Sequence, residues 1–524
     1  MYGKVLSACL QGIDGRIIEV ELDISNGLPQ MTIVGLPDSA IRESIDRVRA
    51  AIKNSGFTFP MERITVNLAP ADLRKEGSAF DLAIAAAILA TSGQIGTDLQ
   101  NTLIVGELSL DGTLRPVPGI LPMVSGARQK GINRVILARD NAEEALLVDG
   151  MKLCPLEHLQ ELRSGIVFHD MNDLKHDISA SAGKETGAPE ETSPGDYADV
   201  RGQHQAKRAL TIAAAGMHNI LLIGPPGTGK TMLMRRLPTI LGDLSEQEAI
   251  EVTKIHSVAG LLINRTQLIR QRPFRSPHHT ISVGGLIGGG TVPKPGEVSL
   301  AHHGVLFLDE LPEFARNVLE VLRQPLEDRQ VTISRAKAVY TYPAHFMLAA
   351  SMNPCPCGYW GAANGARPCS CSPLKIGRYR TRISGPLMDR IDMQVDVPAP
   401  DYSSFAAKEP PLSSTQMKKM VARALNIQKK RFAGLPLRFN SELSGKLLRQ
   451  FCRLKADAES MLQESCHLLG LSARAHDRIL KIARTIADLE ESPDIELAHL
   501  AEAIRYRQLD RRLDLKPEGY PSRG

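Results

Sequence analysis

Aromatic side chains are scarce in this sequence: phenylalanine, tyrosine and tryptophan make up 4% of its 524 residues, and there is a single tryptophan. Proteins that hold unpaired bases stack them on aromatic faces. If this chain binds a nucleic acid, we therefore expect it to follow the phosphate backbone rather than the bases.

Long apolar runs are missing as well. No stretch reaches the roughly 20 residues that a membrane-spanning helix needs, and the first six residues lack the apolar core of a signal peptide. We expect a soluble, cytoplasmic protein with no membrane partner. Eight cysteines in so long a chain do not suggest a disulfide scaffold. The net charge of +5 is a mild basic excess, and its average indicates no class of partner.

The length and the local composition predict several domains. Residues 1–175 alternate strand-like and helix-like segments, which predicts an α/β or α+β domain. Residues 176–195 are rich in Ser, Gly, Ala, Pro and Glu and predict a flexible linker. A nucleotide-binding domain is expected over 196–400. Helical spacing over 401–524 predicts an all-helical C-terminal part.

The period of the apolar residues gives the individual elements. In the first domain we predict strands at 16–24, 30–34, 63–68, 102–108 and 134–138, and helices at 39–53, 79–91 and 122–129. In the last part we predict helices at 416–431, 441–459, 460–469, 473–489 and 495–507.

Eight consecutive residues match the phosphate-binding pattern G-x-x-x-x-G-K-[ST]. They are Gly224, Pro225, Pro226, Gly227, Thr228, Gly229, Lys230 and Thr231. A strand is predicted before them at 219–223 and a helix after them at 232–237, which is the context that this loop requires. The glycines let backbone N–H groups converge on phosphate oxygens. Lys230 is expected to reach the β- and γ-phosphates and Thr231 to bind Mg²⁺, so ATP and Mg²⁺ are the predicted cofactors. The alternative is a glycine-rich turn before a helix.

A second apolar strand is predicted at 304–308, and two carboxylates, Asp309 and Glu310, follow it. Asp309 is expected to hold the Mg²⁺ ion, and Glu310 to polarise the attacking water. A third strand, at 346–352, is followed by Asn353.

Three residues resemble further parts of AAA+ ATPases. Asn353 resembles sensor 1, which helps to place the hydrolytic water; a turn before Pro354 is the alternative. Arg390, in 387–392, resembles the arginine finger that a neighbouring subunit delivers, and an ion pair with Asp389 or Asp392 is its alternative. Arg474 resembles sensor 2 of the helical lid, or is a solvated arginine at a helix end.

Together these features resemble the magnesium-chelatase-like AAA+ ATPases, and the N-terminal region narrows the resemblance to the ComM/YifB family. The resemblance covers nearly the whole chain. It implies an α/β fold: a P-loop AAA+ core with an N-terminal Lon-protease-like α+β domain and a C-terminal helical lid. It also implies a homo-hexameric ring that acts as a DNA motor, promoting branch migration during natural transformation and homologous recombination. Residues 200–210 resemble the segment that packs near the adenine.

The first domain resembles the Lon protease domain at 63–91 and 106–112, but not in its catalytic dyad. Ala79 stands where the nucleophilic serine of that fold would be, and Leu121 where its lysine would be. Ser78 and Asp81 instead have the form of a helix capping box. We predict that this domain does not cleave peptides and serves assembly or DNA contact.

Four cysteines form two C-x-C pairs in the loop 355–371. They are Cys355, Cys357, Cys369 and Cys371. Thiolates at this spacing can converge on Zn²⁺, and four sulfur ligands would make the metal structural. Unpaired structural thiols are the alternative. The histidine pairs 278–279 and 302–303 suggest no metal geometry.

Cations that could contact DNA lie in three places. Arg335 and Lys337 share one face of a hairpin predicted at 330–339, and Arg275 lies in a long insertion after the P-loop helix. Residues 417–455 contain eleven Lys or Arg and one acid. Ordinary surface cations and a solvated helix face are the alternatives. Basic pores also handle acidic peptides, so a protein-remodelling ATPase of the chelatase kind remains a second hypothesis. An ATP-dependent protease is a third one, and the absent dyad disfavours it.

Overall fold

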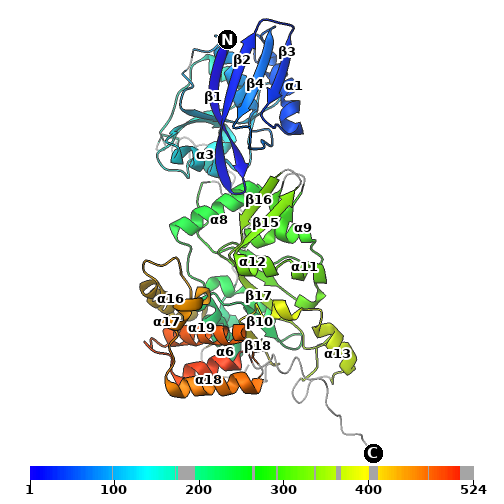
Figure 1. The fold of residues 1–524 in the computed structure, drawn as a ribbon, viewed down its shortest axis with the longest axis vertical. Coiled ribbons are helices and arrows are strands. Elements are labelled where there is room, and N and C mark those ends of the chain that lie inside the picture. Colours follow the sequence, from blue (N-terminus) through cyan, green and yellow to red (C-terminus); the bar gives the residue numbers. More distant parts are fainter. Residues whose placement is uncertain are drawn as a thin grey trace, which may run out of the picture.

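The computed structural model describes residues 1–96, 98–170, 173–174, 195–262, 266–290, 293–335, 338–361, 368–399, 411–469 and 471–507. Most of the linker predicted at 176–195 lies outside these residues, so the domain boundaries stay predictions. Within the described parts, no helix has both the length and the apolar character that crossing a bilayer requires. The N-terminal domain stands at one end of an elongated molecule, and the C-terminal helices lie toward the other (Figure 1).

The N-terminal domain is a mixed seven-stranded sheet covered by helices on both faces. Its strand order is β3–β4–β2–β1–β5–β8–β9. The strands are β1 (Tyr2–Gln11), β2 (Asp14–Ser25), β3 (Gln30–Val34), β4 (Arg63–Ala69), β5 (Thr102–Val105), β8 (Arg134–Ala138) and β9 (Lys152–Leu156). Helices α1 (Ser39–Asn54) and α2 (Asp81–Thr91) pack on one face, and α3 (Ile120–Gln129) and α4 (Ala142–Ala145) on the other.

The structure corrects the predictions for this domain in three places. Strands β1 and β9 were not predicted. The strand predicted at 102–108 is two strands, β5 and β6 (Glu107–Leu108), and β6 pairs with β7 (Leu114–Arg115). The break is at Gly106, whose N–H donates to the carbonyl of Ala79 and whose carbonyl accepts from the N–H of Leu82.

The predicted capping box at Ser78 and Asp81 is also wrong. Helix α2 begins at Asp81, and no side chain caps it. The Ser78 hydroxyl donates to the carboxylate of Glu107. Asp81 is fully buried and pairs with Arg47, with 2.9 Å between Nε and Oδ2. A buried carboxylate needs a partner charge more than a helix end needs a cap, because an unpaired buried charge costs several kcal/mol (about 3–5).

The central domain holds a five-stranded parallel sheet in the order β11–β14–β17–β10–β18. These strands are β11 (Phe274–Arg275), β14 (Val305–Leu308), β17 (Met347–Met352), β10 (Ile220–Ile223) and β18 (Met393–Asp396). Side chains of β10 and β14 alternate between two apolar cores, one on each face of the sheet. The register places Ile223 beside Met352 and Leu308 beside Ala350. The carboxyl ends of β10, β14 and β17 therefore meet at one edge of the sheet.

Short elements surround this sheet. The helices are α6 (His204–Gly216), α7 (Lys230–Arg235), α8 (Glu246–Ala259), α9 (Val283–Ile287), α10 (Glu297–Leu300), α11 (Arg316–Glu320), α12 (Arg323–Asp328), α13 (Pro373–Arg380) and α14 (Gly385–Met388). Two small antiparallel ribbons are β12 (Gly288–Gly289) with β13 (Lys294–Pro295), and β15 (Gln330–Arg335) with β16 (Ala338–Pro343).

The C-terminal part is helical, as predicted. Its helices are α16 (Ser414–Arg431), α17 (Gly445–Phe451), α18 (Ala456–Leu469), α19 (Ala473–Leu489) and α20 (Leu497–Arg505). The single helix predicted at 441–459 is wrong, because α17 and α18 are separate. Between them Leu454 forms a β-bridge with Ile495, which draws the chain out of helical geometry.

The N-terminal domain sits against α8 and the β15–β16 hairpin (Figure 1). Helix α3 packs on α8, and the Ser257 hydroxyl of α8 bonds to the carboxylate of Glu144. Lys254 of α8 lies 3.6 Å from Asp14. At the β1–β2 turn, a Cβ added to Gly12 would lie 2.6 Å from the carbonyl oxygen of Thr341, so the two backbones are in close contact there.

Candidate functional site

The P-loop joins β10 to α7 and holds Lys230 in a buried position. Gly227 and Gly229 have φ of +79° and +86°, a conformation that a side chain would disfavour. The Lys230 ammonium donates to the carbonyls of Gly224 and Pro225 at 2.7 and 2.8 Å, and to Oδ1 of Asn353 at 3.1 Å. Burial lowers the pKa of Lys230, and the nearby carboxylates oppose this. All three ammonium protons thus point toward acceptors that phosphate oxygens could replace.

The carboxylate of Asp309 is held from two sides. The Thr231 hydroxyl donates to its Oδ2 at 2.8 Å, and the Ser351 hydroxyl donates to its Oδ1. A hydroxyl and a carboxylate at this distance are oxygen donors of the kind that Mg²⁺ prefers. The neighbouring Glu310 has φ +54°, in the left-handed region, and its N–H donates to Ser351 Oγ at 3.4 Å. Such backbone strain is unusual for a non-glycine residue and concentrates at functional sites.

These residues line one cleft of about 350 Å³. Its lining is Pro226, Gly227, Thr228, Gly229, Lys230, Thr231, Met232, Asp309, Glu310, Ser351, Met352 and Asn353. The structure thus brings together most of the residues that the sequence assigned to ATP and Mg²⁺. A buried ammonium, glycine-loop amides and a hydroxyl–carboxylate pair fit a magnesium-bound triphosphate in charge and in donor type.

The segment expected near the adenine lies beside this cleft. The Gln203 side-chain amide donates to the carbonyl of Thr228 at 3.3 Å and to that of Pro398 at 2.8 Å. The Gln203 side chain therefore connects the first residues of the central domain to the P-loop and to the segment that follows β18.

Arg390 and Arg474 lie together, away from the lining of the cleft. Arg390 forms an ion pair with Glu327 of α12. The alternative, an ion pair with Asp389 or Asp392, is therefore wrong. The Arg390 Nη1 also donates to the carbonyl oxygen of Pro386 at 2.5 Å. Arg474 Nη2 is 3.8 Å from the same Glu327 carboxylate. Arg390 lowers the pKa of Glu327, and the charges of Arg474 and Arg323 add to this effect. The Glu327 carboxylate thus holds two arginines, Arg390 and Arg474, on a face of the protomer away from its own P-loop.

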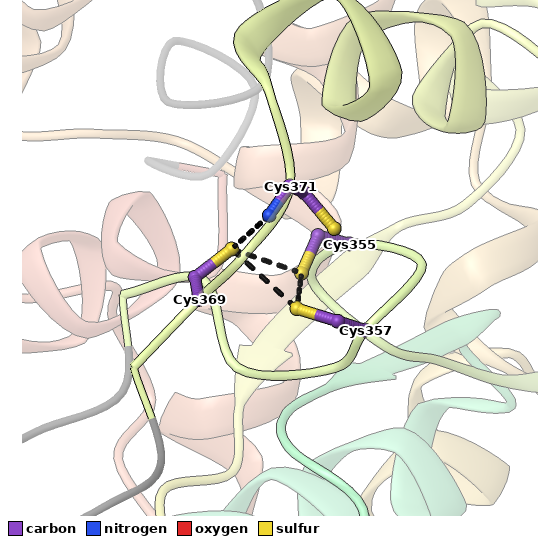
Figure 2. Close-up of side chains that lie close together, drawn as sticks. All are labelled: Cys355, Cys357, Cys369 and Cys371. Atoms are coloured by element: carbon purple, nitrogen blue, oxygen red, sulfur yellow. Dashed lines mark hydrogen bonds between the residues drawn. The ribbon is translucent and has the colours of Figure 1, made fainter.

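The four cysteines converge after β17 (Figure 2). Their sulfur atoms all lie within 4.8 Å of one another. Cys355 Sγ is 3.3 Å from Cys357 Sγ and 3.7 Å from Cys369 Sγ. Four sulfurs at 2.3 Å from a tetrahedral ion would be about 3.8 Å apart, so small shifts would complete a zinc site. The backbone N–H of Tyr359 lowers the pKa of Cys357 to about 6, whereas desolvation raises the pKa of Cys369 and Cys371, so of these three thiols Cys357 alone favours the thiolate without a metal.

A second group of possible ligands is a hydrogen-bonded cluster instead. His302 Nε2 and His303 Nε2 lie 3.3 and 2.9 Å from Oε2 of Glu251. The backbone N–H of His345 donates to Nδ1 of His302 at 3.0 Å, so the proton of the neutral ring is on Nε2. In this arrangement that nitrogen donates to Glu251 and offers no lone pair to a metal, although the sequence analysis did not expect His302, His303 and Glu251 to come together at all.

The protease dyad positions hold no catalytic pair. Ala79 and Leu121 are both buried. Lys75, the lysine in the same segment, directs its ammonium to the carbonyl of Pro70, and Ser78 bonds to Glu107. Tyr340 and Tyr342 of β16 line a pocket with Ser78 and Ala79, so this face of the N-terminal domain is turned toward the central domain.

The residues assigned to DNA differ in their surroundings. Arg275 forms a two-pronged ion pair with Glu297, at 2.6 and 2.8 Å. Arg335 ends β15, and Lys337 lies outside the described residues, so both stay predictions.

The basic segment 417–455 is partly neutralised. Four of its cations pair with acids from other elements: Lys418 with Asp243, Arg423 with Glu491, Arg431 with Asp488 and Arg438 with Glu248. Other members, including Lys429, Lys430, Lys446, Arg449 and Lys455, are exposed.

Two site residues were missed by the sequence analysis. Ser351 is a small polar residue inside an apolar strand, and that mismatch was its only signal. Glu327 carries no local signal, because its partners are 63 and 147 residues away along the chain.

Comparison with known proteins agrees with this geometry. The family model of magnesium chelatase subunit ChlI matches residues 196–405, a second ChlI model matches 20–141, and the ChlI C-terminal model matches 411–507. The protein YifB of Escherichia coli K12 is 45% identical over 504 residues, 96% of both chains. Competence protein ComM of Haemophilus influenzae is 43% identical over 511 residues, 97% of this chain and 98% of its own. Lon protease 2 of Bacillus subtilis is 24% identical over 179 residues, 31% of this chain and 32% of its own.

Replacing Ser351 with alanine should lower nucleotide turnover while leaving nucleotide binding in place. The substitution removes a donor to Asp309 and an acceptor for the Glu310 N–H, a loss of about 1.5 kcal/mol and therefore roughly tenfold in kcat. Steady-state phosphate release and binding of a fluorescent nucleotide measure the two effects. Ser299→Ala is the matched control, because Ser299 is also fully buried in the same domain and its hydroxyl has no hydrogen-bond partner among the described residues. Equal turnover in the two variants would show that Ser351 does not contribute to the site.

Proposed function

The chain belongs to the ComM/YifB family of magnesium-chelatase-like AAA+ ATPases, and we propose that it is a homo-hexameric motor that uses ATP to move along DNA and promote branch migration. The observation that carries this proposal is similarity to a competence protein along almost the whole chain, at 43% identity. Family membership makes the chain an ATPase. The DNA substrate, the hexamer and the role in natural transformation and homologous recombination are the proposed part.

The residues of the cleft then have distinct roles. When bound, Mg²⁺ supplies positive charge at the phosphates, and Thr231 and Asp309 would hold it. Lys230 would exchange its backbone acceptors for β- and γ-phosphate oxygens. Glu310 would take the proton of the attacking water, and Asn353 would orient that water. Ser351 keeps both carboxylate-bearing residues in place.

Among the described residues, none of those that line the cleft is an arginine, and this supports assembly into a ring. Charge that spreads over the γ-phosphate in the transition state is commonly stabilised by an arginine, often from a neighbour. Neither Arg390 nor Arg474 lines the cleft of its own protomer. We infer that both are delivered to the next subunit, and that Glu327 holds them together until then.

DNA as the substrate is supported by exposed cations of the lid, and the scarcity of aromatic residues favours contact with its backbone over its bases. Clustered Lys and Arg bind phosphates without reading the sequence and release counterions. The paired cations, Arg275 among them, are weaker candidates than the exposed members of 417–455. The second candidate function is remodelling of a protein partner, which the chelatase family models favour.

We also propose that Cys355, Cys357, Cys369 and Cys371 hold one structural Zn²⁺ ion. The sulfur spacing and the closed set of four ligands support it. Metal analysis of the purified protein should find one zinc per chain, and Cys369→Ser should lose it. A metal-free protein with four free thiols would contradict this assignment.

DNA should stimulate ATP hydrolysis several-fold if the motor proposal is right. The measurement is kcat with and without single-stranded and forked DNA, at several salt concentrations. Stimulation should fall steeply between about 50 and 200 mM salt, because phosphate contacts release counterions. Glu310→Gln is the control: it should keep ATP binding and assembly but lose about 10²-fold or more of the turnover, with or without DNA. Stimulation by a protein partner alone would favour remodelling instead.

Mixing two inactive variants should restore hydrolysis if Arg390 acts on a neighbour. Lys230→Ala and Arg390→Ala should each be inactive, the latter by about 10³-fold. In a randomly mixed ring, roughly a quarter of the interfaces would join an intact P-loop to an intact arginine. Phosphate release after dissociation and reassembly is the readout. Arg382→Ala, which removes an exposed arginine paired with Glu313 at 3.0 Å, should stay active. No recovery on mixing would place Arg390 within its own subunit.

A further inference from the structure

The cysteine centre begins directly at the nucleotide site. Asn353, which accepts a hydrogen bond from Lys230, is followed by Pro354 and then by Cys355, whose side chain is completely buried. The Trp360 N–H donates to Cys355 Sγ at 3.3 Å. The chain therefore passes from the end of β17 into the cysteine centre within two residues, with no flexible segment between them.

The second pair of cysteines brings a helix back to the same asparagine. Cys369 and Cys371 precede α13, whose N-cap is Ser372. Tyr379 of α13 is buried, and burial raises the pKa of its hydroxyl to about 12, while the nearby backbone N–H of Asn353 opposes this shift. A metal that joins the two C-x-C pairs would thus fix α13 against the backbone of Asn353.

A neighbouring arginine reinforces this arrangement. The Arg380 guanidinium donates to the carbonyl of Pro354 at 3.3 Å from Nη2, and it lies 4.3 Å from the centre of the Trp360 ring. Trp360 belongs to the first half of the cysteine loop and Arg380 to α13. The segment that follows the first C-x-C pair and the helix that follows the second are therefore in contact beside the cysteine centre, as well as through its sulfur atoms.

The turn between the first two cysteines and the tryptophan touches the P-loop itself. The Gly358 N–H donates to the carbonyl of Cys355 at 2.9 Å and closes this turn. A Cβ on Gly358 would lie 2.6 Å from Cδ of Pro226, closer than any real contact. The cysteine centre thus meets both sides of the phosphate-binding cleft, the P-loop and Asn353.

We propose that the metal in the four-cysteine centre controls ATP turnover by holding Asn353 and the P-loop in their working positions. This rests on the zinc site proposed above. The metal takes no part in the reaction, since all four positions around it are filled by sulfur. Its loss would release the loop, α13 and the backbone of Asn353, and it would leave the sheet and the carboxylates of β14 in place.

The first test removes zinc from the full-length protein. Purified protein is treated with a zinc-selective chelator and returned to buffer with excess Mg²⁺; zinc content, far-ultraviolet circular dichroism, ATP binding and kcat are then measured. We expect at least a tenfold loss of kcat at unchanged helix content, reversed by one equivalent of Zn²⁺. Cys466→Ser, which changes a cysteine of the lid outside the centre, should keep its zinc and its turnover.

The second test leaves the metal in place and disturbs the contact. Gly358→Ala should keep one zinc per chain and lose turnover severalfold, because the new methyl group pushes on Pro226. Gly361→Ala is the matched control: Gly361 is in the same loop and has φ +74°, similar to +86° at Gly358, but no described residue lies within 4 Å of its added Cβ. The two substitutions therefore share the backbone strain and differ in the contact.

The outcomes separate the two proposals. Zinc-free protein that hydrolyses ATP at the normal rate, or Gly358→Ala and Gly361→Ala variants with equal turnover, would overturn the coupling and leave the zinc site standing. Wild-type protein purified without zinc would overturn the site. If zinc removal unfolds the domain, the comparison of the two glycine variants decides alone.

Discussion

The site depends on the register of three parallel strands. β10, β14 and β17 end side by side because Ile223 lies beside Met352 and Leu308 beside Ala350. A shift of one residue would exchange the two buried faces of a strand, and both faces are packed. The apolar cores therefore fix, to within one residue, where Thr231, Asp309 and Asn353 stand relative to one another. The chemistry of the cleft therefore follows from packing that lies mostly below it, in the two cores of the sheet.

The sequence predicted the parts of the site that are encoded within a few residues. The P-loop, the carboxylates after β14 and the four cysteines each carry their own spacing, and the family resemblance predicted the fold that joins them. Ser351 was missed because its partner, Asp309, is 42 residues away, and nothing local shows that a serine in an apolar strand positions a distant carboxylate. Strand β1 was missed even though its pairing with β2 is local, across the tight turn at 12–13; only its pairing with β5, which sets Leu6 beside Leu103, is long-range information. The predicted cap at Ser78 was wrong because a distant arginine, Arg47, determines what Asp81 does.

Charge shows the same limit of local reasoning. Eleven cations in 417–455 look like a binding surface when they are counted along the chain. In space, Asp243, Glu248, Asp488 and Glu491 come from other elements and neutralise four of them. The pair of Arg431 with the fully buried Asp488 is structural, because the carboxylate has left water and needs its partner. The basic segment 417–455 thus contains two kinds of cation. Some form ion pairs within the protein and others remain exposed for a ligand, and only the burial of each side chain and its acidic partners distinguish the two kinds.

The arginines at Glu327 connect the geometry of one chain to the need for several. Arg390 is buried, with 7% of its side chain exposed, and a buried guanidinium requires an anion close by. Glu327 supplies it within the protomer, but this carboxylate is half-exposed at 49% and also carries Arg474. The ion pair of Arg390 with Glu327 is therefore buried on the arginine side and open to solvent on the carboxylate side. A neighbour's triphosphate, with more charge than a single carboxylate, would compete for both guanidinium groups where protomers meet. On this reasoning, the ion pair that satisfies the isolated chain also keeps its arginines in the orientation that the proposed ring would use.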